Sequence, residues 1–182
     1  INKNKMNGRF CRHRQFDSKS SYHEPLTART VASCFDSPYS IYCEKFVDKE
    51  EKDKISEYDK LLFQKGNDHE TNVVHEKYPN AVSVSFESPE IGFRSTVESM
   101  VNGDDILHAM PVYYLPNGVY GIPDMLEKSD TGSSVFGDYH YTVTEVKVAK
   151  NIRKSHLIQG AFYNYLLGAI QGITPDTFFM ID

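Results

Sequence analysis

Residues 141–165, YTVTEVKVAKNIRKSHLIQGAFYNY, join a strand pattern to a helix pattern. In a strand, side chains two positions apart lie on the same face. One face of the predicted strand 141–150 therefore carries Tyr141, Val143, Glu145 and Lys147. A predicted helix, 153–172, and a predicted strand, 176–181, follow. This order predicts a right-handed crossover between two neighbouring parallel strands, within a mixed β-sheet flanked by helices.

The charged pair in this strand has two interpretations. Glu145 and Lys147 can form a solvated ion pair on an edge strand, which contributes less than about 1 kcal/mol. Alternatively, they belong to an active site. The second interpretation requires further polar groups that converge on the same place.

The first half of the chain has a helical pattern. Residues 26–47 predict two short helices, with Pro38 in the first turn of the second, and together form an N-terminal helical lobe. A longer helix is predicted from about Asp59 to Lys77, because apolar residues recur there at helical spacing. Its stripe consists of Leu62, Phe63, Gly66, Glu70, Val73 and Val74. Glu70 is a carboxylate on the face that should be buried.

Shorter elements connect this helix to the strand at 141–150. Residues 81–86 alternate as a strand does, and residues 95–101 predict a short helix that ends at Asn102 and Gly103. The Pro-Asn-Gly turn within 115–118 predicts a hairpin between residues 106–114 and 119–128. A loop is expected over 129–140.

Length and composition limit the possible classes of protein. The 182 residues suit one domain, which we expect over residues 26–182, after a flexible polar and basic arm at 1–25. The net charge of −5 argues against coating of nucleic acid by bulk positive charge. No stretch approaches the ~18 apolar residues of a membrane span, and no secretory signal is visible. Because the chain opens on Ile1 and stops after Asp182, we expect a piece of a longer protein, whose domain can be truncated at its C-terminal end.

Three carboxylates can converge near Lys147. Asp124 lies near the end of the strand that precedes the 125–140 loop, and it meets Glu145 if the two strands pair. Glu70 comes from the inner face of a helix that must pack on the sheet. Crowded anions have raised pKa values and reduce stability unless a cation lies between them. Mg²⁺ or Mn²⁺ is the natural cation, because hard ions prefer oxygen ligands.

The motifs GIPDMLE (121–127) and EVK (145–147) resemble the D…(D/E)xK signature of the PD-(D/E)XK nuclease superfamily. The surroundings are similar to its RecB-like exonuclease branch, which includes CRISPR-associated nucleases. The matching segments are SCFDSPYSIYCEKF (33–46), GNDHE (66–70), VNGDDILHAM (101–110) and the QxxxY pattern of Gln159 and Tyr163. The resemblance covers about residues 26–182 and implies a restriction-endonuclease-like core.

The resemblance also implies a role for each matching residue. Asp124 and Glu145 would be catalytic and bind the metal, with the Val146 carbonyl as an extra ligand. Glu70 would complete the ligand set where many relatives have His, and His69 stays open as the alternative. Lys147 would activate the attacking water and stabilise charge on the phosphate. Gln159 and Tyr163 would bind the DNA strand.

Other polar side chains near this region keep two interpretations. Lys150, Arg153 and Lys154 are either phosphate contacts or a solvated helix start. His156 is either a DNA contact or a surface histidine.

The three cysteines, at positions 11, 34 and 43, form no CxxC pair, which favours a reducing, cytoplasmic compartment. An iron–sulfur cluster, which some RecB-like nucleases hold, needs four thiolates, so we predict none.

The predicted function is therefore Mg²⁺- or Mn²⁺-dependent hydrolysis of DNA. Exonuclease action on single-stranded ends is favoured over endonuclease action. The partner would be DNA, either single-stranded or at duplex ends, with no membrane, and the resemblance implies partner proteins of a repair, recombination or CRISPR-like complex. The alternative is a catalytically silent module of the same fold that binds DNA or a partner protein.

Overall fold

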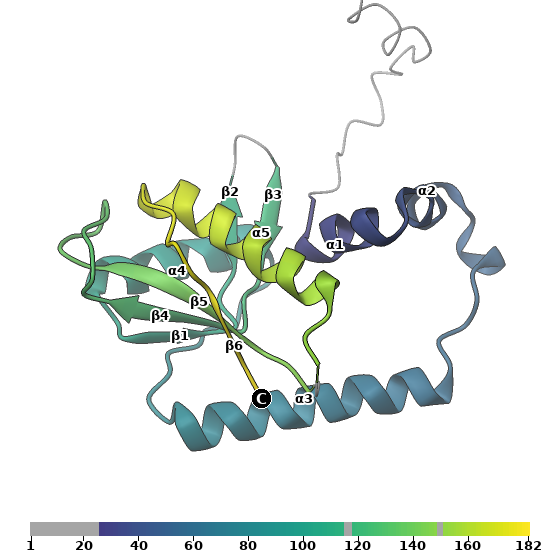
Figure 1. Cartoon of the computed structure of the whole chain (residues 1–182), viewed down its shortest axis with the longest axis horizontal. Coiled ribbons are helices and arrows are strands. Elements are labelled where there is room, and N and C mark those ends of the chain that lie inside the picture. Colours follow the sequence, from purple (N-terminus) through teal and green to yellow (C-terminus); the bar gives the residue numbers. More distant parts are fainter. Residues whose placement is uncertain (1–25, 115–117, 149–150) are drawn as a thin grey trace, which may run out of the picture.

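A computed structural model describes residues 26–114, 118–148 and 151–182 (Figure 1). The predicted arm at 1–25 and Lys150 lie outside the described residues. The helices are α1 (Ala28–Asp36), α2 (Pro38–Phe46), the short 3-10 helix η2 (Lys49–Glu51), α3 (Glu57–Lys77), α4 (Pro89–Asn102) and α5 (Lys154–Gln171). The strands are β1 (Ile106–His108), β2 (Val112–Tyr114), β3 (Val119–Gly121), β4 (Met125–Ser129), β5 (His140–Val146) and β6 (Phe179–Ile181).

The main sheet is mixed, with strand order β1-β4-β5-β6. β1 and β5 both pair with β4 in antiparallel fashion, and β6 pairs with β5 in parallel. The β5–α5–β6 unit therefore joins two neighbouring parallel strands, which confirms the prediction from the sequence. The mixed α/β class is confirmed with it. α5 begins at Lys154 and ends before Gly172. The φ of Gly172 is 77°, the left-handed conformation that commonly follows the end of a helix.

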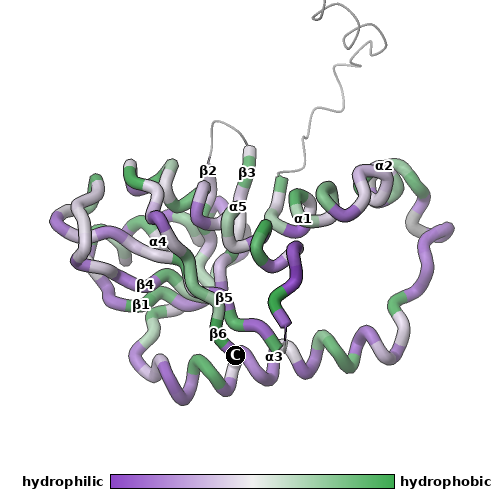
Figure 2. The backbone as a smooth tube through the Cα atoms, in the orientation of Figure 1, coloured by the Kyte–Doolittle hydropathy of each residue, from purple (hydrophilic) through white to green (hydrophobic). Residues whose placement is uncertain are grey.

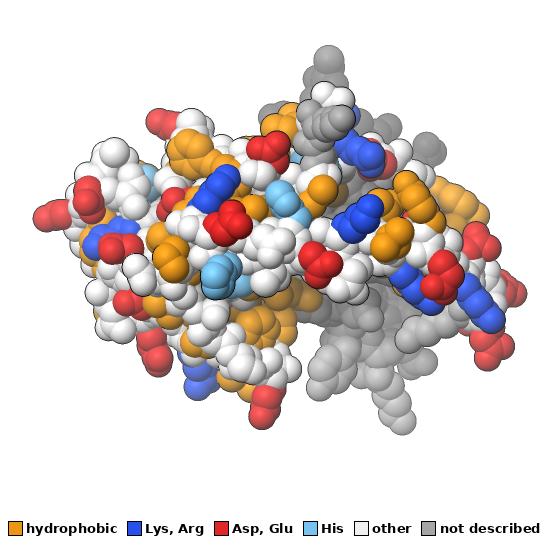
Figure 3. All heavy atoms as spheres, turned by 90° about the horizontal axis from the view of Figure 1, so that it is seen from below, with side chains coloured by type: hydrophobic (Ala, Val, Ile, Leu, Met, Phe, Trp, Pro, Cys, Tyr) orange, Lys and Arg blue, Asp and Glu red, His pale blue; other side chains and the backbone are white. Residues whose placement is uncertain are grey.

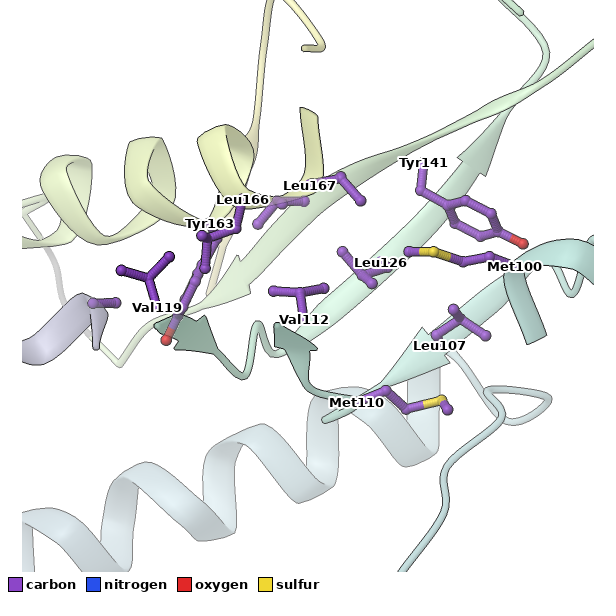
Figure 4. Packing of buried hydrophobic residues seen from close by; sticks show 12 residues of the cluster. Met100, Leu107, Met110, Val112, Val119, Leu126, Tyr141, Tyr163, Leu166 and Leu167 are labelled. Carbon is purple, nitrogen blue, oxygen red and sulfur yellow. The ribbon is translucent and has the colours of Figure 1, made fainter. Parts of the chain in front are cut away.

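The hydrophobic core lies between the sheet and the helices α4 and α5 (Figure 4). Leu126 of β4 is paired with Val143 of β5, so both side chains point to this face of the sheet. Tyr163, Leu166 and Leu167 of α5 pack on them, and Met100 enters from α4. This burial of large side chains from helix and sheet is the main source of stability.

The predicted hairpin forms, but two prolines interrupt it. β2 pairs with β3 as a separate two-stranded sheet, and β1 pairs with β4 in the main sheet. Pro111 and Pro123 stand between the two paired regions, and proline cannot donate a ladder hydrogen bond. The register is nevertheless the same in both paired regions, because Tyr114 pairs with Val119 in β2–β3 and His108 pairs with Met125 in β1–β4.

α3 lies on the opposite face of the sheet from α5 (Figure 1). Its C-terminal half is attached there, because the Tyr78 hydroxyl donates to Glu127 Oε1 at 3.4 Å and Lys77 Nζ donates to the Asp182 carbonyl at 3.2 Å. Its N-terminal half extends past the sheet, and Figure 2 shows hydrophobic residues along both halves. Leu62 and Phe63 remain 48% and 61% exposed there. The expected buried stripe is therefore wrong for this half of the helix.

Two smaller elements also differ from the prediction. Residues 81–86 form a single bridge, between Val82 and Leu107, instead of a strand. The helix expected over 95–101 begins earlier, at Pro89, because Ser88 caps it by accepting a hydrogen bond from the Ile91 N–H. Its end after Asn102 is confirmed, with Gly103 in the left-handed conformation. In the part of the chain that the structure describes, no helix is long and apolar enough to span a membrane.

Candidate active site

Asp124 and Glu145 lie side by side because β4 and β5 are antiparallel. Met125 is paired with Thr144, so the residue before β4 is next to the penultimate residue of β5. The sequence placed Asp124 near the end of a strand, and the structure instead places it immediately before β4. The strand starts later because Pro123 precedes Asp124 and cannot join the ladder. The expected convergence of the two carboxylates is nevertheless present.

Each carboxylate accepts a backbone hydrogen bond from the segment of the other. The Val146 N–H donates to Asp124 Oδ2 at 2.7 Å, and the Asp124 N–H donates to Glu145 Oε1 at 3.2 Å. Lys147 Nζ lies between them, 2.8 Å from Glu145 Oε2 and 3.4 Å from Asp124 Oδ2. Asp124, Glu145 and Lys147, which we call the acidic cluster, therefore form one connected unit. The interpretation of Glu145 and Lys147 as a solvated surface pair is wrong, since Glu145 is 0% exposed.

Burial dominates the electrostatics of this cluster. It raises the pKa of Glu145 to about 7, and repulsion by Asp124 adds to the rise, against the attraction of Lys147. Burial also raises the pKa of Asp124, where Lys147 opposes the rise and Glu70 adds to it. The neighbouring anions raise the pKa of Lys147 in spite of its own burial. One lysine thus compensates only part of the charge of two buried carboxylates.

Glu70 is near the acidic cluster, but it contacts a residue that the sequence did not single out. His108, the last residue of β1, has its ring Nε2 3.2 Å from Glu70 Oε1. The Ala109 N–H, next along the chain, donates to the Asp124 carbonyl at 3.0 Å. The register of the predicted hairpin could have identified His108 as a site residue, because it pairs this residue with Met125, the neighbour of Asp124.

His69, the alternative to Glu70, does not contact β1 in this way. Its side chain is half-buried, and among the described residues no hydrogen-bond partner exists for its buried ring Nε2. Glu70 is therefore the α3 side chain that is joined to the strand beside Asp124. Burial is the main cause of the raised pKa of Asp124, and the negative charge of Glu70 adds to the rise.

α5 places Gln159 and Tyr163 on the same side of the helix. Gln159 Nε2 donates to the Tyr163 hydroxyl at 3.1 Å. The Tyr163 ring is buried in the core (Figure 4), against Gly121, where any side chain would collide with it. Burial raises the pKa of Tyr163, and the negative charge of Glu145 adds to the rise.

Basic side chains surround the start of α5. Burial lowers the pKa of His156, and the positive charges of Lys147 and Arg153 lower it further. His156 Nδ1 also accepts a hydrogen bond from the Arg153 N–H at 3.3 Å. Lys147, Arg153 and His156 therefore lie close together.

The cysteines lie outside the acidic cluster. Cys34 is exposed and Cys43 is half-buried, both as free thiols, and Cys11 is outside the described residues.

The chemistry of the cluster suits a hard divalent ion. No group of three or more His, Cys, Asp and Glu side chains that could hold a metal ion occurs among the described residues. Mg²⁺, however, is usually bound through one or two carboxylates, with water or phosphate oxygens as its other ligands. Asp124 and Glu145 supply that pair, and their pKa values are raised mainly by burial, with a further contribution from nearby carboxylates. The donor set therefore fits Mg²⁺ or Mn²⁺.

Comparisons with family models, with curated proteins and with solved structures found no match to this chain.

Proposed function

We propose that this protein is a metal-dependent DNA nuclease that hydrolyses phosphodiester bonds, with a restriction-endonuclease-like core of the RecB-like branch. One observation carries the proposal: two carboxylates, the half-buried Asp124 and the fully buried Glu145, share a single ammonium group, Lys147, at the end of a β-sheet. Groups with shifted pKa values that gather in this way are typical of functional sites. The order of motifs around them is the order expected for RecB-like nucleases.

The residues in and around the acidic cluster would have different roles. Asp124 and Glu145 would hold the ion, together with the Val146 carbonyl and with Glu70 on the side of α3. When bound, Mg²⁺ or Mn²⁺ supplies Lewis acidity and a water of lowered pKa. Lys147 would stabilise the negative charge that develops on the phosphate. Gln159 would orient the DNA backbone through its amide, with Tyr163, to which it donates a hydrogen bond, as its support.

A silent module that binds DNA or a partner protein is the second candidate. It is favoured by the way Lys147 already occupies the space between the carboxylates. The contact of Glu70 with His108, instead of with Asp124 or Glu145, favours it as well. A module of this kind would bind without cleaving.

Cleavage of end-labelled single- and double-stranded DNA, with Mg²⁺, Mn²⁺ or a chelator, separates the two candidates. We expect metal-dependent cleavage by the wild type and its loss in Glu145→Ala and Lys147→Ala. Glu127→Ala is the matched control, because Glu127 is a carboxylate of the neighbouring strand β4 that contacts Tyr78 instead of the cluster. Binding without cleavage would support the silent module, and cleavage in chelator would refute the mechanism.

A further inference from the structure

α2 presents a row of exposed aromatic rings. Tyr39 and Tyr42 are stacked, with ring centroids 6.0 Å apart and planes inclined by 17°. Tyr42 and Phe46 are next, 5.0 Å apart with planes inclined by 37°. Tyr39 and Tyr42 are 71% and 56% exposed. We call these three rings the α2 aromatic ladder. The acidic residue between them, Glu44, is two positions from Tyr42 and therefore lies on another face of the helix.

The ladder continues toward the acidic cluster through basic side chains. Phe35, exposed at the end of α1, lies beneath Lys154 Nζ, which is 5.9 Å from the ring centroid. Lys154 begins α5, and α1 packs against α5 (Figure 1). Arg153 is the preceding residue, and its N–H donates to His156 Nδ1 at 3.3 Å. The start of α5 therefore places two cations, Arg153 and Lys154, beside an exposed aromatic ring, although the whole protein has a net charge of −5.

The tyrosine rings of α2 lie at the surface, since more than half of each side chain is exposed. Seen from below, hydrophobic side chains occur together with Lys and Arg, and with acidic side chains, at the end of the molecule that carries α2 and the start of α3 (Figure 3). Exposed rings of this number are not needed for the core, which lies between the sheet, α4 and α5. A binding surface explains why they are retained at the surface.

We propose that the α2 aromatic ladder binds single-stranded DNA and leads its end to the acidic cluster. This inference rests on the proposed function and names its substrate. Bases of a single strand have free faces that can stack on Tyr39 and Tyr42, while the phosphates contact Arg153 and Lys154. Paired bases in a duplex are already stacked, so the ladder selects for single strands.

The test measures the affinity of the full chain for a fluorescent oligothymidylate and for a blunt duplex, by anisotropy with Ca²⁺ in place of Mg²⁺. We expect Tyr39→Ala with Tyr42→Ala to weaken oligothymidylate binding about 30-fold, from two lost stacking contacts. Tyr39→Phe with Tyr42→Phe keeps both rings and should restore the affinity. Tyr165→Ala, at a similarly exposed tyrosine on α5, is the matched control and should bind as the wild type does.

Two results would overturn the inference: unchanged affinity in the double alanine variant, or an equal loss in Tyr165→Ala. The wild type is also assayed for DNA cleavage with Mg²⁺. If it cleaves while the double alanine variant binds oligothymidylate normally, the ladder proposal fails and the nuclease proposal stands. If it does not cleave but binds through the ladder, the nuclease proposal fails and the binding surface is supported.

Discussion

Two polar side chains, Gln171 at the end of α5 and Glu145 near the end of β5, are both 0% exposed, but their surroundings differ. The Gln171 amide is satisfied, since Oε1 accepts from the Tyr141 N–H at 2.8 Å and Nε2 donates to the carbonyls of Tyr141 and Ile173 at 3.0 and 2.9 Å. Glu145 is buried beside a second carboxylate, and its pKa is raised. Buried polar groups stabilise the fold at one end of β5 and oppose its stability at the other.

This difference makes Glu145 the stronger candidate for a functional group. A group that reduces stability is retained when the site needs it. Gln171 can be explained by packing alone, because it fastens α5 to the start of β5. Glu145 cannot, since its ionised form is disfavoured by burial and by Asp124.

Asp124→Asn should have the largest effect. Under the proposed function it lowers the rate of DNA cleavage by about 10²–10³-fold, because one carboxylate of the site is lost. The fold should persist, since an amide oxygen can still accept the hydrogen bond from the Val146 N–H. The measurement is the cleavage rate at saturating Mn²⁺, with circular dichroism to check folding. Full activity in a folded Asp124→Asn variant would remove Asp124 from the site.

Gln171→Ala should mainly affect stability. The free energy of unfolding in urea should fall by about 2–4 kcal/mol, because the change creates a cavity and leaves buried backbone groups of Tyr141 without partners. Gln64→Ala is the control, since Gln64 is exposed on α3 and donates only to Asp68; its effect should stay within about 0.5 kcal/mol. Equal effects of the two changes would refute the structural role of Gln171.

Much of the fold follows from local patterns. The β5–α5–β6 unit was predictable because Gly172 ends the helix and apolar residues alternate on both sides of it. The hairpin was predictable from its turn, and the hairpin also brings Asp124 next to β5. Two members of the site, Asp124 and Glu145, were therefore placed correctly relative to each other by the sequence.

The remaining features depend on tertiary contacts that a local pattern does not contain. Leu62 and Phe63 have helical spacing, but the sheet ends before it reaches them, so they stay exposed. Residues 81–86 alternate as a strand does, yet they find only a single bridge to β1. Glu70 was identified by its place in an apolar stripe, whereas its partner His108 depends on how α3 crosses β1.

The pH dependence of stability should identify the end of β5 that opposes folding. The pKa of Glu145 is 4.5 when unfolded and about 7 when folded. A raised pKa stabilises the fold below pH 4.5, and this contribution is lost as the pH rises through 7. Without divalent ions, the wild type should therefore lose about 3 kcal/mol of unfolding free energy between pH 4.5 and 8 through this group.

Glu145→Gln isolates that contribution. Asp124, with a raised pKa, acts in the same direction as Glu145, whereas the lowered pKa of His156 acts in the opposite one. The pKa of Lys147 is raised from 10.5, so this residue does not titrate in this range. The measurement is urea unfolding of both proteins in chelator across the range. The same pH slope in wild type and Glu145→Gln would contradict the assignment.

His108→Ala should have the smallest effect, and it tests whether the α3 side of the site works with the β5 side. His108 is a positioning residue in this scheme, since it contacts Glu70 and not the reacting groups. Its loss should weaken Mn²⁺ binding about 10-fold, as is usual for residues that orient metal ligands. Titration calorimetry of the wild type and the variant measures this change.

A merely structural role of His108 predicts a different pattern. It would lower the unfolding free energy of the variant without a change in Mn²⁺ affinity, and His108→Gln would then be no better than alanine. A positioning role predicts that His108→Gln restores affinity, because an amide can still donate to Glu70 Oε1. His75→Ala, at an exposed histidine of α3, should leave Mn²⁺ affinity unchanged. If Glu70→Ala also leaves Mn²⁺ affinity unchanged, Asp124 and Glu145 hold the metal without Glu70. The Glu70–His108 contact then serves only to attach α3 to the sheet.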